Sequence, residues 1–347
     1  MIANTTFRRA IQSAAAAAFL ATTMLSGLAH AGPTLDKINQ RGAIKVGVGT
    51  TPGFFAPDSD GKWQGFFIDF GRALSIAVFG TPDKVEFTSS SPQQRLPALQ
   101  SGEFDILLSG VTVTTTRAFK LGFHFGPTVF YDGQGILVRK DLGVTKAADL
   151  DGATNVADFF RKTGKTFTPV TIEDTGQFID ALESGRVDAI TQDSSDLVGK
   201  RTQLKKPDDY VLLPERLSKE PLAPAIAGGD DRWLELVNWT VNATIQAEEW
   251  GITSANVDEF LKSEDPAIQR FLGVDPSFAN DIGLDPKWAY TIIKTVGNYG
   301  EIFDRHLKPL GWDRGYNSLW TDGGLLYSPP FRWQFGAALQ QGPPEWA

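Results

Sequence analysis

Residues 98–107 read Ala-Leu-Gln-Ser-Gly-Glu-Phe-Asp-Ile-Leu, and residues 181–190 read Ala-Leu-Glu-Ser-Gly-Arg-Val-Asp-Ala-Ile. Each copy has the pattern of a helix end, a glycine stop and the start of an apolar strand. Gly102 and Gly185 stand where a helix ends in the left-handed conformation, which glycine adopts without a Cβ penalty. Because this junction occurs twice, we expect two similar α/β lobes, and paired lobes usually bind something between them.

The residues around the first copy predict a parallel sheet. Residues 43–49, 85–88 and 104–108 read as apolar strands, and residues 66–79 and 92–101 read as the helices between them. This alternating order is typical of a parallel sheet with helices on both faces.

Two extended segments without an intervening helix mark where the chain passes between lobes, at residues 125–138 and 221–227. We therefore expect lobe 1 to comprise residues 32–131 and 222–332, and lobe 2 to comprise residues 132–221. Lobe 1 then has a helical C-terminal part, with helices predicted over residues 232–250, 256–262, 266–272 and 286–303.

The two ends of the chain carry different signals. Arg8 and Arg9 precede an apolar, alanine-rich stretch, and Ala29-His30-Ala31 fits a small-x-small cleavage site. Residues 1–31 are therefore predicted to be a secretory signal peptide, cleaved after Ala31. The last fifteen residues, 333–347, have no clear period, and we expect them to be disordered.

Composition excludes several classes of protein and site. The chain has 347 residues, enough for two domains. It has no cysteine, so an exported protein of this sequence must hold itself together without disulfides, and zinc sites built on cysteine are excluded. The net charge of −8 argues against nucleic acid as a partner.

Candidate binding residues lie in three loops, because ligands of open parallel sheets bind beyond the carboxyl ends of the strands. Arginine grips a carboxylate with two parallel hydrogen bonds, and nearby hydroxyl and backbone N–H groups can assist. An aspartate can grip an ammonium group. A cation from one lobe and an anion from the other would suit a zwitterion lying between them. The candidates are Phe54 after the first strand, Gly110, Thr112, Thr114 and Arg117 after the first copy of the repeat, and Asp193 after the second.

Each candidate also has an ordinary structural interpretation. Arg117 could be a surface residue at the start of a helix, and Asp193 could be an N-cap, as most aspartates at such positions are. Phe54 and Phe55 could belong to the core. Spacing alone does not choose between these interpretations.

Five stretches make the whole mature chain resemble the polar amino-acid family of periplasmic solute-binding proteins, the receptors of ABC importers. Residues 34–131 and 208–332 look closest to its general L-amino-acid-binding branch. The resemblance implies a type II periplasmic binding protein fold, with two lobes that are each a mostly parallel sheet flanked by helices, joined by two crossing strands. It also implies closure around a free amino acid, with Thr112 and Arg117 holding the α-carboxylate and Asp193 the α-amino group. The matching stretches are Asp132-Gly-Gln-Gly-Ile-Leu-Val-Arg139, Ser218-Lys-Glu-Pro-Leu-Ala-Pro224, Asn256-Val-Asp-Glu259, Gly297-Asn-Tyr-Gly-Glu301 and Gly323-Gly-Leu-Leu-Tyr-Ser-Pro-Pro-Phe-Arg332.

The sequence departs from the family pattern at two places. Lobe 2 has only residues 152–173 for a strand-helix-strand unit, which usually needs about 30 residues or more. Compared with the family pattern, a strand and its Gly-Thr-Thr-type turn are missing there, unless residues 153–157 form a shorter strand. Phe67 stands where the family usually has aspartate. Both changes weaken the prediction of the ligand more than that of the fold.

The leading hypothesis is therefore a monomeric, non-enzymatic periplasmic receptor that delivers L-amino acids to an inner-membrane ABC permease by lobe closure, with no cofactor or metal. One alternative is an accessory protein with reduced or lost amino-acid binding, suggested by the short lobe 2. Another is a dehydratase-like enzyme on the same fold, which needs a general acid in the cleft. The sequence shows no evident carboxylate pair for that role.

Overall fold

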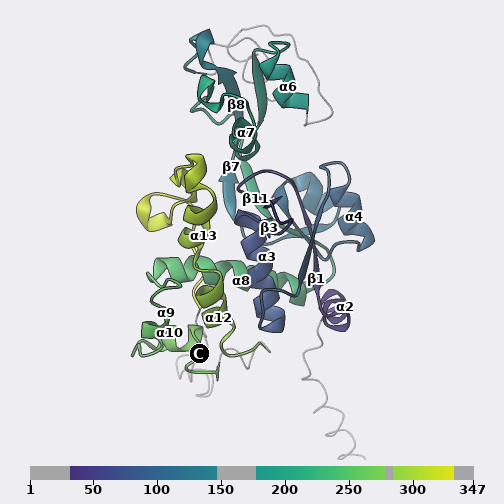
Figure 1. Ribbon diagram of the computed structural model, residues 1–347. Helices are drawn as coiled ribbons and strands as arrows, with labels where there is room; N and C mark the ends of the chain where they lie inside the picture. Colours follow the sequence, from purple (N-terminus) through teal and green to yellow (C-terminus); the bar gives the residue numbers. More distant parts are fainter. Residues whose placement is uncertain (1–31, 147–176, 278–283, 332–347) are drawn as a thin grey trace, which may run out of the picture.

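The computed structural model describes residues 32–146, 177–277 and 284–331. Two α/β lobes are visible, a large one and a smaller one that carries β8, α6 and α7 (Figure 1). The two-lobed architecture expected from the sequence is therefore confirmed. The expected signal peptide, the C-terminal tail and the shortened stretch 152–173 lie outside the described residues. Within the described residues, no helix is long and apolar enough to cross a membrane.

The large lobe is built on one sheet in which three strands run parallel. Its order is β4-β1-β5-β11-β6, and β7 pairs with β11. The pairs β1–β4 and β1–β5 are parallel, whereas β11 is antiparallel to β5, β6 and β7. The strands are β1 (Ile44–Val48), β4 (Val85–Ser89), β5 (Ile106–Thr112), β6 (Phe123–Phe125), β7 (Phe130–Asp132) and β11 (Glu220–Ala227), with a small hairpin of β2 (Ala56–Pro57) and β3 (Trp63–Gln64) beside them.

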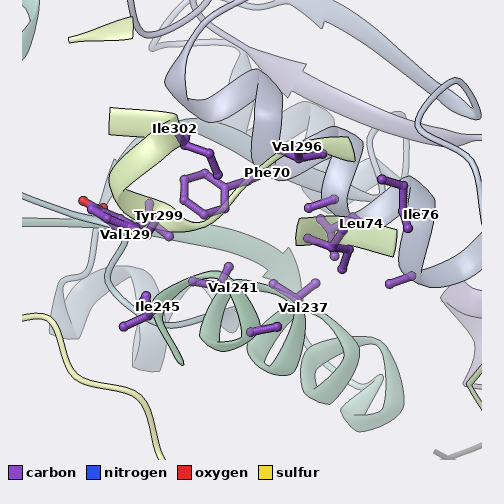
Figure 2. Close-up of a cluster of buried hydrophobic side chains, with 14 of the residues drawn as sticks. Phe70, Leu74, Ile76, Val129, Val237, Val241, Ile245, Val296, Tyr299 and Ile302 are labelled. Atoms are coloured by element: carbon purple, nitrogen blue, oxygen red, sulfur yellow. The ribbon is translucent and has the colours of Figure 1, made fainter. Parts of the chain in front are cut away.

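Helices from both ends of the chain cover this sheet and form the main core. Phe70 and Leu74 of α3, Val237 and Val241 of α8 and Tyr299 of α13 gather in one buried cluster (Figure 2). The helices of the large lobe are α2 (Pro33–Arg41), α3 (Phe66–Phe79), α4 (Arg95–Ser101), α8 (Asp231–Glu249), α9 (Val257–Phe260), α10 (Pro266–Phe271), α12 (Trp288–Thr295) and α13 (Tyr299–His306).

The last predicted helix, over residues 286–303, is two helices instead. Gly297 breaks it with a φ of 100°, a conformation that favours glycine. Asn298 then caps α13: its side chain accepts a hydrogen bond from the backbone N–H of Glu301, whose own side chain accepts one from the backbone N–H of Asn298. The prediction was wrong because the apolar period continues across this capping box.

The smaller lobe differs in strand direction from the mostly parallel sheet that the sequence led us to expect. Its described sheet has the order β10-β8-β9, and both pairs are antiparallel. The physical reason is that β8, the continuation of the first crossing strand, occupies the centre of this sheet. The elements here are β8 (Gln134–Arg139), β9 (Ala189–Asp193), β10 (Tyr210–Leu212), α6 (Gln177–Glu183) and α7 (Ser194–Arg201).

Two chain segments join the lobes and run close together. The first passes from β7 through Gly133 into β8, and the second leads from β10 into β11. The backbone N–H of Leu217 donates to the carbonyl of Gln134 across them. A Cβ atom placed on Gly133 would lie 2.6 Å from the carbonyl oxygen of Ser218, so only glycine fits this close approach.

The lobes also touch away from these crossings. The hydroxyl of Thr51, after β1, donates a hydrogen bond to the carboxylate of Asp196 in α7. A Cβ atom on Gly199 of α7 would lie 2.6 Å from the methyl carbon of Thr51 and 3.2 Å from the carbonyl oxygen of Pro52. The structure thus has the two lobes closed against one another at this point.

Candidate functional site

The first copy of the repeat leads into the lobe 1 side of the candidate site. After the Gly102 cap, whose φ is 78°, the chain enters β5, which ends at Thr112. Gly110 lies within β5 with a φ of 64°. The strand is longer than predicted, so Thr112 is a strand residue, with only 8% of its surface exposed. The loop that follows leads directly to the cation.

Arg117 lies in a π-helical turn, η1 (Thr116–Lys120), directly after this loop. Its backbone N–H donates to the hydroxyl of Thr114 at 3.2 Å, and its Nη1 donates to the carbonyl oxygen of Thr112 at 2.6 Å. The guanidinium is therefore held against the end of β5, with Thr112 and Thr114 beside it. The structure brings these three predicted residues together.

The second copy leads to Asp193, the last residue of β9. Asp193 occupies the N-cap position of α7, but its side chain makes no capping hydrogen bond. Burial raises the pKa of Asp193 to about 7, and the carboxylates of Asp132, Asp196 and Glu220 push it in the same direction, whereas Arg95 opposes them. The ordinary interpretation of Asp193 as a helix cap is thus not supported.

A second acidic group, Asp132, lies at the end of the first crossing strand. Its carboxylate accepts hydrogen bonds from the backbone N–H groups of Gly133 at 2.8 Å and Ser195 at 3.1 Å. Burial raises its pKa to about 6 despite these bonds. Glu220 stands opposite it in the strand register of β11 and β7. Negative charge is therefore concentrated where the crossings meet lobe 2, which favours a cationic group nearby.

A cavity of about 360 Å³ lies between the lobes. Its walls come from the loops that follow β1 and β4 and from Ser109 within β5 in lobe 1, and from the end of β9 and α7 in lobe 2. These are the carboxyl ends of the three parallel strands, where ligands of such sheets bind. The lining is mostly polar, with Ser90, Gln94 and Gln192 among its residues, and both signs of charge are present in Asp196 and Lys200.

Arg95 is the cavity residue that sequence reasoning missed. It begins α4, and its Nη1 donates to the carbonyl oxygen of Ser109 at 2.6 Å, while its buried Nε has no hydrogen-bond partner among the described residues. Burial lowers the pKa of Arg95, the positive charge of Arg117 acts in the same direction, and Asp196 and Asp193 oppose it. Arg95 therefore interacts electrostatically with the proposed clamps of both lobes.

The signal for Arg95 was present in the sequence. It follows the strand now seen as β4, whose carboxyl end meets the same sheet edge as those of β1 and β5. The loops expected to carry the site follow the other strands, and the loop after β4 was not among them. It also placed residues 92–94 inside the helix, whereas α4 begins only at Arg95, after a turn in which Ser91 accepts from Arg95.

Phe54 is placed in the core and not on this cavity. Only 1% of its surface is exposed, and its ring packs edge-on against those of Phe130 and Trp312. The neighbouring Phe55 lines the cavity instead. The backbone N–H groups of Phe54 and Phe55 both donate to the carbonyl oxygen of Thr51. This tight turn directs the ring of Phe54 into the core and the ring of Phe55 toward the cavity. Phe67 packs against Phe54 and Phe55 and so supports this wall from behind.

The comparison with protein families identifies the chain. Residues 44–254 match the family described as bacterial extracellular solute-binding proteins, family 3. The chain belongs to this family. After the matched region the chain continues for a further 93 residues, from Ala255 to Ala347.

Sequence similarity to several proteins covers most of this chain. The general L-amino acid-binding periplasmic protein AapJ of Rhizobium johnstonii is 45% identical over 86% of this chain and 93% of its own. The glutamate/glutamine/aspartate/asparagine-binding protein BztA of Rhodobacter capsulatus is 40% identical over 91% and 99%. A periplasmic binding protein from Brucella ovis with glutathione bound is 43% identical, with a TM-score of 0.83 over 87% of this chain and 100% of that one.

AapJ and BztA are named as amino-acid-binding proteins, and the protein from Brucella ovis is described as an ABC transporter / periplasmic binding protein. The type II periplasmic binding protein fold and the family membership expected from the sequence are therefore confirmed. The role of this family 3 protein is that of a substrate-binding receptor.

Proposed function

We propose that this protein is a periplasmic receptor that captures an L-amino acid between its lobes. Arg117, with Thr112, Thr114 and the backbone at Gly110, binds the α-carboxylate, and Asp193 binds the α-ammonium group. The observation that carries the proposal is the pairing of a fixed guanidinium in lobe 1 with a carboxylate in lobe 2 that has no ion pair within the described residues. A zwitterion complements both charges at once.

The cavity beside these clamps points to a polar side chain on the ligand. Arg95 and Lys200 offer positive charge, and Gln192 and Gln94 offer amide groups. An amino acid with an acidic or amide side chain would form hydrogen bonds with these groups when buried there, whereas an apolar side chain would offer them none. The names of the relatives AapJ and BztA, which cover such amino acids, support this ligand class.

A second candidate ligand is a small peptide with a further carboxylate. The structure of the relative from Brucella ovis has glutathione bound, and 100% of that relative's chain matches 87% of this one. Arg95 and Lys200 provide a second cationic position on the cavity, distinct from Arg117. The same clamps would then hold the amino-acid end of the peptide.

The wider biological role follows from this assignment. We propose cleavage of residues 1–31 after Ala31, function as a monomer in the periplasm, and delivery of the ligand to an inner-membrane ABC permease. Lobe 1 is residues 32–131 with 222–332, and lobe 2 is residues 132–221. Closure moves the lobes about the crossings near Gly133. This is a binding cycle without a chemical step.

Calorimetric titration of ligand-stripped protein with a panel of L-amino acids and glutathione tests the proposal. We expect saturable binding of at least one acidic or amide amino acid, and loss of about 100-fold or more in Arg117→Ala, because truncating a buried charge partner costs about 2–5 kcal/mol. Lys120→Ala, on the same turn but exposed, is the matched control and should bind normally. Absence of heat with the whole panel from folded protein would reject this function.

A further inference from the structure

A second cavity, of about 440 Å³, lies outside the interlobe cleft. It is bounded by the end of α8, the start of α10 and the segment 320–331. Figure 1 shows α9 and α10 at the end of the molecule opposite lobe 2. Of this lining, only Gln246, Glu249 and Trp250 fall inside the region that matches the family model, which ends at residue 254. The C-terminal extension therefore completes this cavity.

The cavity wall is rich in aromatic rings that are unusually exposed. Trp320 is 59% exposed and Tyr327 is 62% exposed, although large aromatic side chains are usually buried for the most part. Trp250 and Phe331 complete the aromatic lining. Phe331 is anchored by edge-on packing against Phe271, so this wall rests on the core. Aromatic faces carry negative electrostatic potential and attract cations.

A carboxylate without a cationic partner stands at the same cavity. Glu249, the last residue of α8, accepts hydrogen bonds from the backbone N–H of Ser328 at 3.1 Å and from the Nε2 of Gln246 at 3.0 Å. It forms no ion pair within the described residues. The adjacent Glu248 does, with Arg314 at 2.9 Å. The last turn of α8 has no basic residue.

The position of Glu249 is electrostatically unfavourable for the protein alone. A helix C-terminus carries partial negative charge, which disfavours acidic side chains and attracts cations. The carboxylate, the helix end and the aromatic faces therefore all create negative potential in one cavity. A bound positive charge would relieve this arrangement.

We propose that this cavity is a second ligand site that binds a small quaternary ammonium compound. Trp250, Trp320 and Tyr327 contact the methylated head group, and Glu249 balances its charge from the cavity wall. A quaternary ammonium group needs no hydrogen-bond acceptor, which suits a carboxylate already accepting from Ser328 and Gln246. Aromatic enclosure of such groups is a known use of the cation–π interaction.

The charge of Glu249 makes a further distinction between ligands of this class. A quaternary ammonium compound with a neutral remainder, such as choline, should bind better than glycine betaine, because the carboxylate of betaine is repelled by Glu249. The uncharged isostere 3,3-dimethylbutanol has the shape of choline without its charge. It should bind at least tenfold more weakly than choline.

Titration of the full-length mature protein with choline, followed by calorimetry and tryptophan fluorescence, tests the site. We expect saturable binding that weakens at least tenfold in Trp320→Ala and in Glu249→Gln, while Tyr316→Ala, an exposed aromatic residue outside the cavity, binds choline normally. Amino-acid binding should be unchanged in all three variants, and Asp193→Asn should still bind choline, which separates this site from the cleft.

Three results would overturn the proposal. These are no saturable binding of choline, equal binding of the uncharged isostere, and unchanged choline affinity in both cavity variants. Glu249→Gln keeps the size of the side chain and an oxygen acceptor for Ser328, so it reports on charge. A thermal unfolding curve of each variant verifies that it is folded.

Discussion

Asp193 is the residue whose environment says most about ligand capture. Its pKa is about 7 because the carboxyl is buried and lies near Asp132, Asp196 and Glu220. An ammonium group placed beside it would stabilise the ionised carboxylate and lower that pKa. Ligand binding should therefore release a proton from the protein near neutral pH.

Affinity for the amino acid should consequently rise with pH. With a pKa of about 7 in the free protein, about one Asp193 in ten is ionised at pH 6 and about nine in ten at pH 8. Because the ionised form binds the ammonium group, Kd should fall about tenfold over this range. Calorimetry at pH 6, 7 and 8, in buffers of different ionisation enthalpy, measures both affinity and proton release.

Two variants control this pH prediction. Glu220→Gln removes one carboxylate that raises the pKa of Asp193, so the rise in affinity should move to lower pH. Asp193→Asn should bind weakly at every pH. A Kd that stays constant in the unmodified protein between pH 6 and pH 8 would contradict the role given to this carboxylate.

Ligand-free stability should show the opposite pH dependence. The pKa values of Asp193 and Asp132 are raised to about 7 and about 6, above the ordinary aspartate value of 3.8. The folded state then binds more protons than the unfolded state between those values, so the free energy of unfolding contributed by these groups falls as pH rises from about 4 to 7. Thermal unfolding without ligand should give a lower Tm at pH 8 than at pH 5.5, and bound amino acid should reduce that difference. A Tm that rises over this range in the free protein would be inconsistent with these pKa values.

Arg95 should decide which side chains the cleft accepts. Arg95 lines the cavity, so its guanidinium can form a charged hydrogen bond with an acidic ligand side chain, worth about 1.5–3 kcal/mol. Arg95→Gln should weaken glutamate binding by about 10- to 100-fold and alanine binding much less. Titrations of both ligands, with Arg95→Lys as the charge-preserving control, measure the difference. Equal losses for both would mean that Arg95 acts on the protein and not on the ligand.

At the scale of elements, the repeated junction shows how far local sequence can predict structure. Gly102 and Gly185 both end a helix with positive φ, 78° and 69°, as the pattern predicted. This succeeds because a glycine cap depends on a few neighbouring residues. Asp105 and Asp188 occupy equivalent positions in the two copies of the repeat. Their environments in the fold differ, because their partners lie outside the repeat. Asp105 accepts from Arg41 and from the backbone N–H of Lys45, whereas Asp188 lies 3.7 Å from Arg139 at the surface.

The two aspartates should therefore differ in their contribution to stability. Asp105→Ala leaves the buried N–H of Lys45 and the guanidinium of Arg41 without their acceptor, and should lower the free energy of unfolding by about 2 kcal/mol. Asp188, with a side chain 74% exposed, should tolerate alanine within about 0.5 kcal/mol. Urea unfolding of both variants tests this. Similar losses would show that the buried contacts of Asp105 add nothing.

At the scale of the whole molecule, the sequence indicated candidate residues but not their arrangement. Arg117 and Asp193 were proposed because they lie beyond the two copies of the repeat, and their role as clamps stays a prediction. The cavity between the lobes could not be predicted, because it depends on contacts such as Thr51 with Asp196, which are 145 residues apart. The antiparallel pairing of β8 with β9 and β10 was missed for a similar reason: the direction of these strands is set by the path of the crossing segment and not by local pattern.

The contact between lobes at Gly199 makes lobe closure testable with a single substitution. Because a Cβ atom there would meet Thr51 and Pro52 of the other lobe, Gly199→Leu should hold the lobes apart. The same change favours α7 itself, since leucine forms helix better than glycine by about 0.8 kcal/mol, so the variant should not lose stability. With saturating amino acid we expect a larger radius of gyration in solution scattering and at least tenfold weaker binding, while Lys206→Leu, which adds the same side chain at an exposed position of this lobe, changes neither. Unaltered affinity and radius of gyration in Gly199→Leu would mean that ligand binding does not require this closed contact. Weaker binding at undiminished stability would instead tie ligand capture to the approach of α7 toward the loop after β1.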